Sequence, residues 1–374
     1  MSGRHDLLVV GAGILGLATA LAATRRGWSV AVVDRDTQAN GASIRNFGFV
    51  TVSGQERGQM WARARRTRDT WLEVGPAAGI TVIQSGAWIT ARRPESVAVL
   101  ESFLETEMAE GCRLLGAAEA RRRCPALVAP ELQAVLVSDA EFRVESREAI
   151  PRLASWLERT HGVTFIRDCT ALAVELPEIR TSRGPVQAAR LVVCPGDDFS
   201  GLYGDRLARY SLTRCKLQMM RLADPGFRLP GTVLSDLSIA RYSGFSDLAP
   251  AAALKARLAS EHPEELRRGV HLIVAQGADG SLVVGDSHEY ATTPDPFSHQ
   301  GIDDLILREF ESALGIPAPR VFERWTGTYA SAADRAVLVD APEPQVRILI
   351  VTSGAGASTG FALGEEVISS FGED

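Results

Sequence analysis

The sequence predicts an α/β protein in which buried parallel strands alternate with helices, and three observations support this fold class. A GxGxxG segment follows an apolar run near residue 10, and a second glycine-rich turn follows another apolar run near residue 354. The hydrophobic fraction of the 374 residues is 45% and the charged fraction is 23%, as in ordinary globular proteins. A chain of this length is expected to form one large composite domain or two intimate ones.

The first predicted unit is a strand, a turn, a helix and a second strand. Leu7–Val10 is a short apolar run of the kind that a buried parallel strand needs. It continues directly into Gly11–Gly16, and small apolar residues then follow at helical spacing until Gly27, which can end the helix. The second strand, Ser29–Val33, places Asp34 at its carboxyl end.

This unit has the pattern of a dinucleotide cradle. Gly11 permits the tight turn, Gly13 lets the backbone approach a pyrophosphate, and Gly16 lets the helix lie close to the strand. The helix N-terminus offers free N–H groups to the phosphates, and Asp34 can accept hydrogen bonds from ribose hydroxyls. A purely structural glycine turn is the alternative. The candidate cofactor-binding residues here are Gly11, Gly13, Ile14, Leu15, Gly16, Asp34 and Arg35.

The second glycine turn lies near the other end of the sequence. Arg347–Val351 is predicted to be a buried strand, a glycine-rich turn spans residues 352–360, and apolar residues at helical spacing follow. An ordinary turn of an αβ unit would also explain this pattern. Two such turns in one chain favour a long cofactor held at both ends. The candidate residues are Gly354, Gly356, Ser358, Thr359 and Gly360.

Composition excludes several classes of protein. Lys and Arg total 40 against 46 Asp and Glu, a net charge of −6, which argues against a nucleic-acid partner. The five cysteines are scattered and never spaced as CxxC, so neither a disulfide scaffold nor a metal site is expected. No leader pattern and no run of about 18 apolar residues is found, so we expect a cytoplasmic protein without a membrane span.

Motifs along the whole chain resemble those of the D-amino-acid oxidase superfamily, which includes glycine oxidase, sarcosine oxidase and D-amino-acid dehydrogenase. They are GAGILGLATA (11–20), ASIRNFG (42–48), LVVCPG (191–196) and SGAGASTGF (353–361). Four further segments look similar to a subfamily of FAD oxidoreductases associated with bacterial aminophosphonate breakdown: CKLQMMR (215–221), GDSHEY (285–290), ERWTGTYAS (323–331) and VTSGAG (351–356). The resemblance implies FAD and oxidation of a C–N bond to an imine, which water hydrolyses.

The resemblance also implies a discontinuous, Rossmann-like FAD-binding domain interleaved with an α+β substrate domain on a mixed antiparallel sheet. We place the FAD-binding domain at 1–80, 145–212 and 321–374, and the substrate domain at 81–144 and 213–320. A charged helix within 248–268 is expected to be either a lid or a surface insertion. The further FAD-binding residues that the resemblance implies, with the backbone of Ala171 facing the adenine, are Ser43, Arg45, Asn46, Phe47, Gly48, Ala171 and Gly196.

Two departures from the wider family are informative. Covalent sarcosine oxidases use a cysteine in the segment that corresponds to 327–335, where this chain has none, so non-covalent FAD is expected. In glycine-oxidase-like relatives the same segment reads Gly-Leu-Arg-Pro, and its arginine binds the substrate carboxylate as a bidentate fork. Here Tyr329 takes the place of that arginine. This difference argues against a conventional α-amino-acid clamp.

A tetrahedral phosphonate would instead need several donors from different directions. The candidate substrate-binding residues are Lys216, Gln218, Arg241 and Tyr242, and the candidate catalytic residues are Arg45, His288 and Tyr329. Five of these residues have an ordinary alternative. Lys216 and Gln218 share one face of a strand that points either into a cavity or into solvent. Arg241 and Tyr242 can be a surface pair, and His288 a hydrogen-bonded structural histidine.

The predicted function is FAD-dependent oxidation of a small anionic amine, in which hydride passes to flavin N5. The preferred substrate is 2-aminoethylphosphonate or its N-alkyl derivative, which would give phosphonoacetaldehyde. The flavin would be reoxidised by O2 or by another electron acceptor, so both an oxidase and a dehydrogenase remain possible. The alternatives are a glycine, sarcosine or D-amino-acid oxidase or dehydrogenase, an NAD-dependent dehydrogenase, and a non-catalytic flavoprotein subunit. The sequence predicts no oligomeric state.

Overall fold

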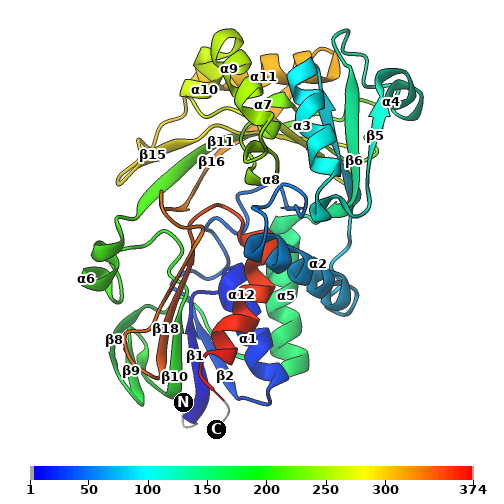
Figure 1. The fold of residues 1–374 in the computed structure, drawn as a ribbon. Coiled ribbons are helices and arrows are strands. Elements are labelled where there is room, and N and C mark those ends of the chain that lie inside the picture. Colours follow the sequence, from blue (N-terminus) through cyan, green and yellow to red (C-terminus); the bar gives the residue numbers. More distant parts are fainter. Residues whose placement is uncertain (1–3, 373–374) are drawn as a thin grey trace.

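Two β-sheets organise the protein, each with helices on it (Figure 1). The computed structural model describes residues 4–372. The first sheet has eight strands, six of them in the order β17-β18-β10-β1-β2-β7, with β8 and β9 joined through β10. Their bounds are β1 (Arg4–Val10), β2 (Val30–Val33), β7 (Thr164–Ile166), β8 (Ala171–Glu175), β9 (Glu178–Thr181), β10 (Gly184–Val193), β17 (Val337–Asp340) and β18 (Val346–Val351).

The centre of the first sheet is parallel and buried. β1 pairs in parallel with β2 and β10, β10 pairs in parallel with β18, and β2 with β7. Leu7, Leu8 and Val9 are fully buried, because helices on one face and the β8–β9 hairpin with its neighbours on the other exclude water. The helices beside the first face are α1 (Ile14–Arg25), α2 (Gln59–Ala78), α5 (Ser146–His161) and α12 (Gly356–Ser369).

The helices α1 and α12 lie unusually close together. Both are rich in small residues, and a Cβ on Gly364 of α12 would be 2.7 Å from the backbone carbon of Ala18 in α1. This contact brings the two ends of the chain together, since α1 follows the first glycine turn and α12 follows the second. Because β1 and β18 both pair in parallel with β10, the two turns predicted from the sequence lie at the same edge of the sheet, after the carboxyl ends of these strands.

The second sheet is mixed, with ten strands. Eight have the order β15-β11-β14-β13-β12-β4-β6-β3, while β16 pairs with β11 and β5 with β6. Only the β12–β4 pairing is parallel among the pairings described for this sheet. The bounds are β3 (Phe49–Val50), β4 (Gln84–Ala91), β5 (Cys112–Gly116), β6 (Ala134–Arg143), β11 (Thr213–Leu222), β12 (Thr232–Leu234), β13 (Ile273–Gln276), β14 (Leu282–Gly285), β15 (Glu289–Ala291) and β16 (Val321–Ser331).

Further helices lie around the second sheet and in the connections. They are α3 (Pro94–Leu104), α4 (Ala117–Arg123), α6 (Gly204–Leu207), α7 (Asp236–Ile239), α8 (Ser243–Ser246), α9 (Ala251–Glu261), α10 (Pro263–Arg267) and α11 (Gln300–Leu314), with short 3₁₀ turns at Glu107–Ala109 and Ala208–Tyr210. None of the helices within residues 4–372 combines the length and the apolar character that a bilayer crossing requires.

The architecture confirms the predicted α/β class with a Rossmann-like sheet and a second, mixed sheet. The predicted domain limits stay a prediction, but the strand pairing differs from them at one place. Strand β16 begins the segment 321–374 that we placed with the first sheet, yet it pairs along β11 in the second sheet. The segment 248–268 forms α9 and α10 rather than one helix, and α9 buries Leu254 and Leu258 against the core of the second sheet.

Candidate functional site

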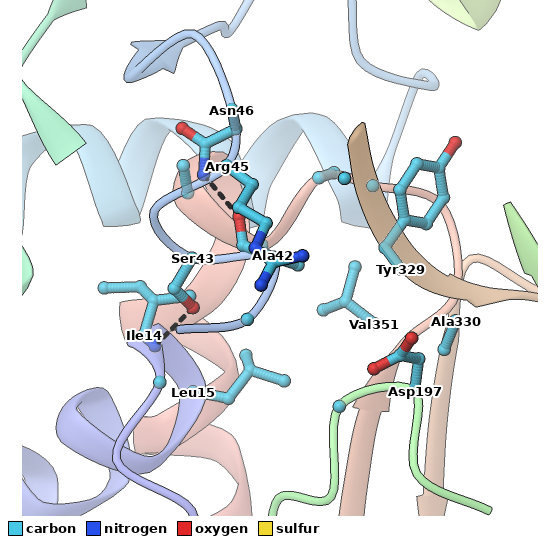
Figure 2. Close-up of a pocket in the computed structure, with 18 of the residues that line it drawn as sticks. Ile14, Leu15, Ala42, Ser43, Arg45, Asn46, Asp197, Tyr329, Ala330 and Val351 are labelled. Carbon is cyan, nitrogen blue, oxygen red and sulfur yellow. Dashed lines mark hydrogen bonds between the residues drawn. The ribbon is translucent and has the colours of Figure 1, made fainter. Parts of the chain in front are cut away.

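A cavity of about 610 Å³ extends from the glycine turns of the first sheet to the face of the second. Its walls come from the two ends of the chain, from the 39–60 connection, from the loop after β10 and from the second sheet. No residue of 248–268 lines it, which favours the surface insertion over the lid. Figure 2 shows its central part, where the N-terminus of α1 faces the segment around Ser43.

The first glycine turn leaves room for no side chain. Gly11 has φ +103°, and a Cβ there would be 2.4 Å from the carbonyl oxygen of Cys194. A Cβ on Gly16 would be 1.7 Å from the oxygen of Gly11, so the helix can approach the strand only with glycine at this position. The Ile14 N–H donates to Ser43 Oγ at 2.9 Å (Figure 2), which fixes the 42–48 segment over the start of α1.

Asp34 closes this end of the cavity at the carboxyl end of β2. One carboxylate oxygen accepts from the Ala12 N–H at 2.6 Å and the other from the Asp36 N–H at 2.8 Å. Because these contacts hold the carboxylate in place at the cavity wall, its remaining lone pairs can accept from a ligand hydroxyl. The α12 end is similar, since Gly354 has φ +74° and the residues from Ser353 to Ser358 line the cavity.

Most of the predicted cofactor-binding residues line this cavity, and three do not. The three are Gly48, Thr359 and Gly360, which support the walls instead. A Cβ on Gly48 would be 1.8 Å from the oxygen of Val144, and one on Gly360 would be 3.2 Å from the Ile14 side chain. Thr359 is fully buried and its hydroxyl donates to the carbonyl of Ala355. Direct contact with a cofactor is therefore not expected for these three residues.

The opposite end of the cavity is lined by polar side chains rather than by glycine turns. Four of the residues predicted from the sequence lie here: Arg241, Tyr242, His288 and Tyr329. Arg45 lines the cavity from the 42–48 segment, beside the start of α1. The ring of Tyr329 lies over Gly354, where a Cβ would be 3.1 Å from it, so this tyrosine joins the two ends of the cavity. Arg241 donates to the hydroxyl of Tyr290 at 2.8 Å, and Arg45 to Asn40 at 3.0 Å.

The two tyrosines at this end keep their protons over a wide pH range. Burial raises the pKa of Tyr329 and that of Tyr242 above the usual value for a phenol. Burial also raises the pKa of Cys215, which lies behind Tyr329, to about 11. The tyrosines are therefore hydrogen-bond donors at neutral pH, and Arg241 is the cation beside them.

Lys216 and Gln218 lie outside the cavity, on the other face of β11. The Lys216 ammonium donates to the carbonyls of Asp295 and Phe297 and lies 2.9 Å from a carboxylate oxygen of Glu289. The Gln218 amide donates to Asp303 and His299 and accepts from the His299 N–H. The face that the two share is directed at the 289–303 segment, which corrects the expectation that they contact substrate.

A protein-family model described as "FAD dependent oxidoreductase" matches residues 6–369. The chain belongs to this family. A search of the curated proteins found no match. FAD is therefore the cofactor of this enzyme, as the resemblance predicted, and the protein is an FAD-dependent oxidoreductase.

Solved structures of similar fold agree with this assignment. A glycine oxidase from Bacillus cereus is 14% identical, with 98% of this chain and 95% of that chain covered and a TM-score of 0.78. An FAD-bound L-α-glycerophosphate oxidase from Mycoplasma pneumoniae is 15% identical, with coverages of 100% and 96% and a TM-score of 0.77. An iminodiacetate oxidase from Chelativorans sp. BNC1 is 19% identical, with coverages of 97% and 94% and a TM-score of 0.74.

The residues present fit FAD. The cavity is long, and Gly11 and Gly13 present bare backbone to it. A Cβ on Gly11 would meet the Cys194 carbonyl and one on Gly13 would lie 3.0 Å from Ser43 Oγ, so glycine at both positions keeps the turn tight beside the space for a pyrophosphate. The N-termini of α1 and α12 both reach the cavity, so their free N–H groups are available to phosphate and flavin oxygens. Asp34 is placed for a ribose hydroxyl, and the backbone at Ala171 lines the far end.

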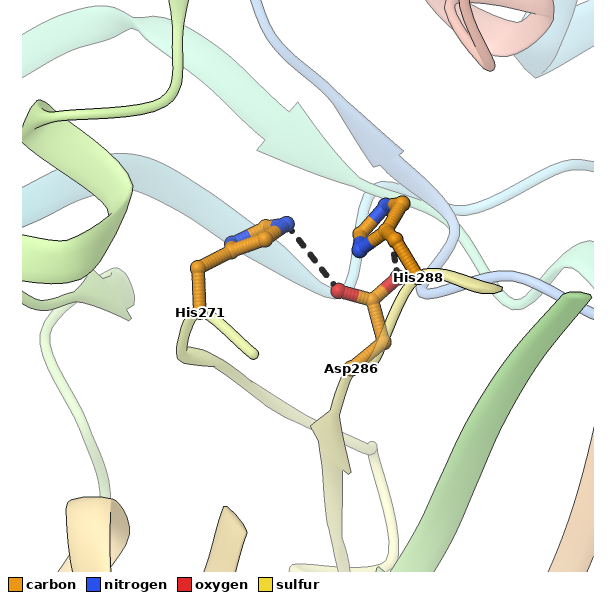
Figure 3. A group of neighbouring side chains, drawn as sticks. All are labelled: His271, Asp286 and His288. Atoms are coloured by element: carbon orange, nitrogen blue, oxygen red, sulfur yellow. Dashed lines mark ion pairs between the residues drawn. The ribbon is translucent and has the colours of Figure 1, made fainter. Parts of the chain in front are cut away.

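Two residues of the cavity wall were not among the candidate site residues predicted from the sequence. His271 and Asp286 lie beside His288, all three buried, with His271 Nε2 3.0 Å from Asp286 Oδ1 and His288 Nε2 3.9 Å from Asp286 Oδ2 (Figure 3). Burial lowers the pKa of His271 and lowers that of His288 to about 3. Burial favours neutral Asp286, but the charges of His288, His271 and Arg241 outweigh it and lower the pKa of the carboxyl.

Only a weak signal for this group is present in the sequence. GDSHEY contains Asp286 and His288, but a pair two residues apart is common and matches no metal-site spacing. His271 lies in a different segment, and the β13–β14 hairpin brings it beside Asp286 through the hydrogen bonds between the backbones of these two residues. The expectation of no metal cluster therefore rested on spacing alone, and the fold creates a group of possible ligands that spacing cannot show.

Proposed function

We propose that this FAD-dependent oxidoreductase oxidises the C–N bond of a small amine that carries an anionic group. The observation that carries the proposal is the set of donors in one cavity, where Arg241, Tyr242 and Tyr329 line the wall opposite the first glycine turn and Arg45 lines the cavity from the 42–48 segment. Cations and neutral donors arriving from separate elements suit an oxyanion with several acceptor atoms. The glycine oxidase and the iminodiacetate oxidase among the similar structures support an amine as the reacting group.

The anionic group that we prefer is a phosphonate. A single arginine at the Tyr329 position would form a planar fork suited to a carboxylate, whereas Tyr329 offers one donor along one direction. With Arg241, Arg45 and Tyr242 as further donors, the set surrounds a tetrahedral group better than a planar one. The proposed substrate is 2-aminoethylphosphonate or its N-alkyl derivative, in agreement with the resemblance of the CKLQMMR and GDSHEY segments.

The chain's own residues position the substrate and exclude water. Arg241 and Arg45 hold the anionic group, and the buried hydroxyls of Tyr242 and Tyr329 complete its hydrogen bonds, which leaves the amine carbon directed toward the flavin. Bound FAD supplies the acceptor for the hydride and its electron pair. Loss of hydride from the carbon and of a proton from nitrogen gives an imine. Water then hydrolyses the imine to phosphonoacetaldehyde and ammonia, or to an alkylamine from the N-alkyl substrate.

Three further features belong to this proposal. FAD is held without a covalent bond, because the 327–335 segment, where covalent sarcosine oxidases have their cysteine, contains none in this chain. The electron acceptor is O2 or another oxidant. The predicted cytoplasmic location stays a prediction.

An anaerobic absorbance titration of the yellow protein tests the proposal. The amines to compare are 2-aminoethylphosphonate, its N-methyl form, glycine, sarcosine and D-alanine, and the readout is loss of the oxidised-flavin band near about 450 nm. We expect the phosphonates to bleach the flavin, and Arg241→Met to raise the substrate concentration required at least about tenfold, since it removes a charged hydrogen-bond donor. Arg113→Met is the matched control, because Arg113 pairs with Asp139 on the surface.

The outcomes separate the candidate functions. Bleaching by the carboxylates alone would keep the amine chemistry and overturn the phosphonate, in favour of a glycine-, sarcosine- or D-amino-acid-type oxidase or dehydrogenase. A yellow protein that no amine bleaches would overturn the amine proposal and favour a non-catalytic subunit. Equal effects of Arg241→Met and Arg113→Met would show that Arg241 does not hold the anionic group.

A further inference from the structure

His271, Asp286 and His288 form a buried group in the cavity wall, called here the His–Asp–His group. Their relative exposures are 3%, 4% and 8%, so bulk water does not solvate the ring nitrogens or the carboxylate. One ligand atom from each residue can be chosen so that all three lie within 4.8 Å of one another. Figure 3 shows both imidazoles directed at the carboxylate. Three polar side chains that are buried and directed at one another need a physical explanation.

The hydrogen bonds behind the rings fix which nitrogens face Asp286. His288 Nδ1 lies 2.9 Å from the carbonyl oxygen of Gly269, and a carbonyl can only accept, so Nδ1 carries the proton. The Ser238 hydroxyl donates to the carbonyl of Leu272 at 2.8 Å, which leaves its oxygen to accept from His271 Nδ1 at 3.2 Å. In the neutral rings, the Nε2 lone pairs of both histidines therefore point toward the carboxylate.

Lone pairs that face one another without a positive partner repel. His271 Nε2 is 3.0 Å from Asp286 Oδ1, yet that oxygen is buried and receives no hydrogen bond of ordinary geometry from residues 4–372. An unsatisfied buried carboxylate oxygen costs free energy, so the arrangement calls for a cation between the ligand atoms. A proton shared by His271 and Asp286 is the simplest cation, but it leaves the convergent Nε2 of His288 without a role.

The geometry fits a metal ion better. At metal–ligand distances of about 2.1 Å, neighbouring ligand atoms are separated by about 3.4 Å in a tetrahedral site and about 3.0 Å in an octahedral one, and opposite octahedral ligands by about 4.2 Å. The separations of 3.0 Å from His271 Nε2 to Asp286 Oδ1 and 3.9 Å from His288 Nε2 to Asp286 Oδ2 are of this size, and one atom from each residue can be chosen with all three within 4.8 Å. The hydrogen bonds from Nδ1 to the Gly269 carbonyl and to Ser238 are those that orient metal-bound imidazoles, because they fix the tautomer and the ring.

We infer that His271, Asp286 and His288 form a binding site for one divalent first-row transition-metal ion in the cavity wall. Two imidazoles and one carboxylate are ligands that zinc, iron(II) and manganese accept, whereas magnesium and calcium prefer oxygen alone. Three protein ligands leave further positions open, and because all three residues line the cavity, those positions face its interior.

The charged neighbours act on the ion in opposite directions, since Asp286 attracts a cation and Arg241 repels it. Asp286 is the anion of the group, and Arg241 is the cation close enough to act on it and on both histidines. Tyr242 packs edge-on against His271, and Tyr290 and Tyr329 lie beside His288. A divalent ion would make this wall strongly positive with Arg241. If the proposed function holds, its open positions would take an oxygen of the anionic group, but metal binding itself does not depend on the substrate.

Zinc binding to the FAD-loaded protein tests the inference in the absence of substrate. Protein treated with EDTA and dialysed is titrated with ZnCl2 by calorimetry, and its zinc content after equilibrium dialysis is measured by mass spectrometry. We expect one zinc ion per chain in the wild type. Asp286→Asn should weaken binding at least about 100-fold, since it removes the anionic ligand, and Ser238→Ala about tenfold to 100-fold through the orientation of His271.

His299→Asn is the matched control. His299 lies 3.3 Å from Asp295 on the surface, and within residues 4–372 no third possible ligand completes a group there, so its loss should leave the zinc stoichiometry unchanged. The visible spectrum of bound FAD reports folding of each variant, and Ser238→Ala keeps the test decisive if Asp286→Asn loses FAD. Absence of zinc binding in the wild type, or equal binding by wild type and Asp286→Asn or Ser238→Ala, would overturn the metal site and favour a shared proton.

Discussion

The two ends of the cavity are built from different parts of the chain. At the FAD end, the cavity wall consists mainly of backbone: the glycine turns, the N-termini of α1 and α12, and the 42–48 segment fixed through Ser43. At the substrate end, the wall consists of side chains from separate elements of the second sheet and its connections, including Arg241, His271, Asp286 and Tyr329. The first end is set by local backbone geometry, and the second by which side chains the fold brings together.

This difference explains how each end responds to substitution. A carbon added to a glycine where two chain segments touch is poorly tolerated, because the backbone atom that the new carbon meets cannot move away. A side-chain site tolerates exchange of a single donor, because the cavity keeps its shape while one interaction is lost. Three substitutions, ordered from the largest expected effect to the smallest, test this contrast.

The largest effect is expected for Gly16→Ala at the FAD end. The added methyl group would lie 1.7 Å from the oxygen of Gly11, so α1 must move away from β1 and the cradle must open. We expect a loss of about 3 kcal/mol in the free energy of unfolding and loss of most bound FAD. Urea denaturation and the visible absorbance of the purified protein measure the two effects.

A matched glycine gives the control for this substitution. Gly301 lies in α11 with open space around it, so Gly301→Ala should keep FAD and leave stability unchanged or raised by about 0.5–1 kcal/mol. If Gly16→Ala bound FAD as tightly as the wild type, the close contact between turn and helix would not be what forms the cradle.

Tyr329→Phe should have an intermediate effect that is confined to the substrate end. The ring over Gly354 remains, so FAD binding should persist, while the buried donor hydroxyl is lost. A hydrogen bond to a charged group is worth about 1.5–3 kcal/mol, which corresponds to a fall of about tenfold to 100-fold in kcat/KM for flavin reduction. Stopped-flow kinetics measure the change, with Tyr210→Phe, a tyrosine outside the cavity, as the control. An unchanged kcat/KM would remove Tyr329 from the substrate site.

The smallest effect on activity is expected for Lys216→Met. Its ammonium contacts only the 289–297 segment among the described residues, on the face of β11 away from the cavity. Replacement should cost about 1–2 kcal/mol of stability through lost hydrogen bonds and leave kcat/KM within about twofold. Thermal unfolding and steady-state kinetics check the two parts. A large fall in kcat/KM without loss of stability would restore Lys216 to the substrate site.

The substrate end shows where prediction from the sequence reached its limit. Arg241, Tyr242, His288 and Tyr329 were predicted as donors to an anionic group and do line the cavity. Lys216 and Gln218 were predicted on the same grounds, but period-two spacing gives only the shared face and not its direction. The position of α11 and the 289–303 segment decides that direction, and these elements lie about 70 to 100 residues away in the sequence.

The sequence by itself determined the α/β class, the two glycine turns and the FAD end of the cavity. Each depends on local order, since glycines between a strand and a helix restrict the backbone whatever surrounds them. Only the tertiary structure decided that Gly48, Thr359 and Gly360 support the walls, that β16 joins the second sheet and that His271 meets Asp286. These outcomes depend on contacts between distant segments, which the spacing of residues along the chain does not contain.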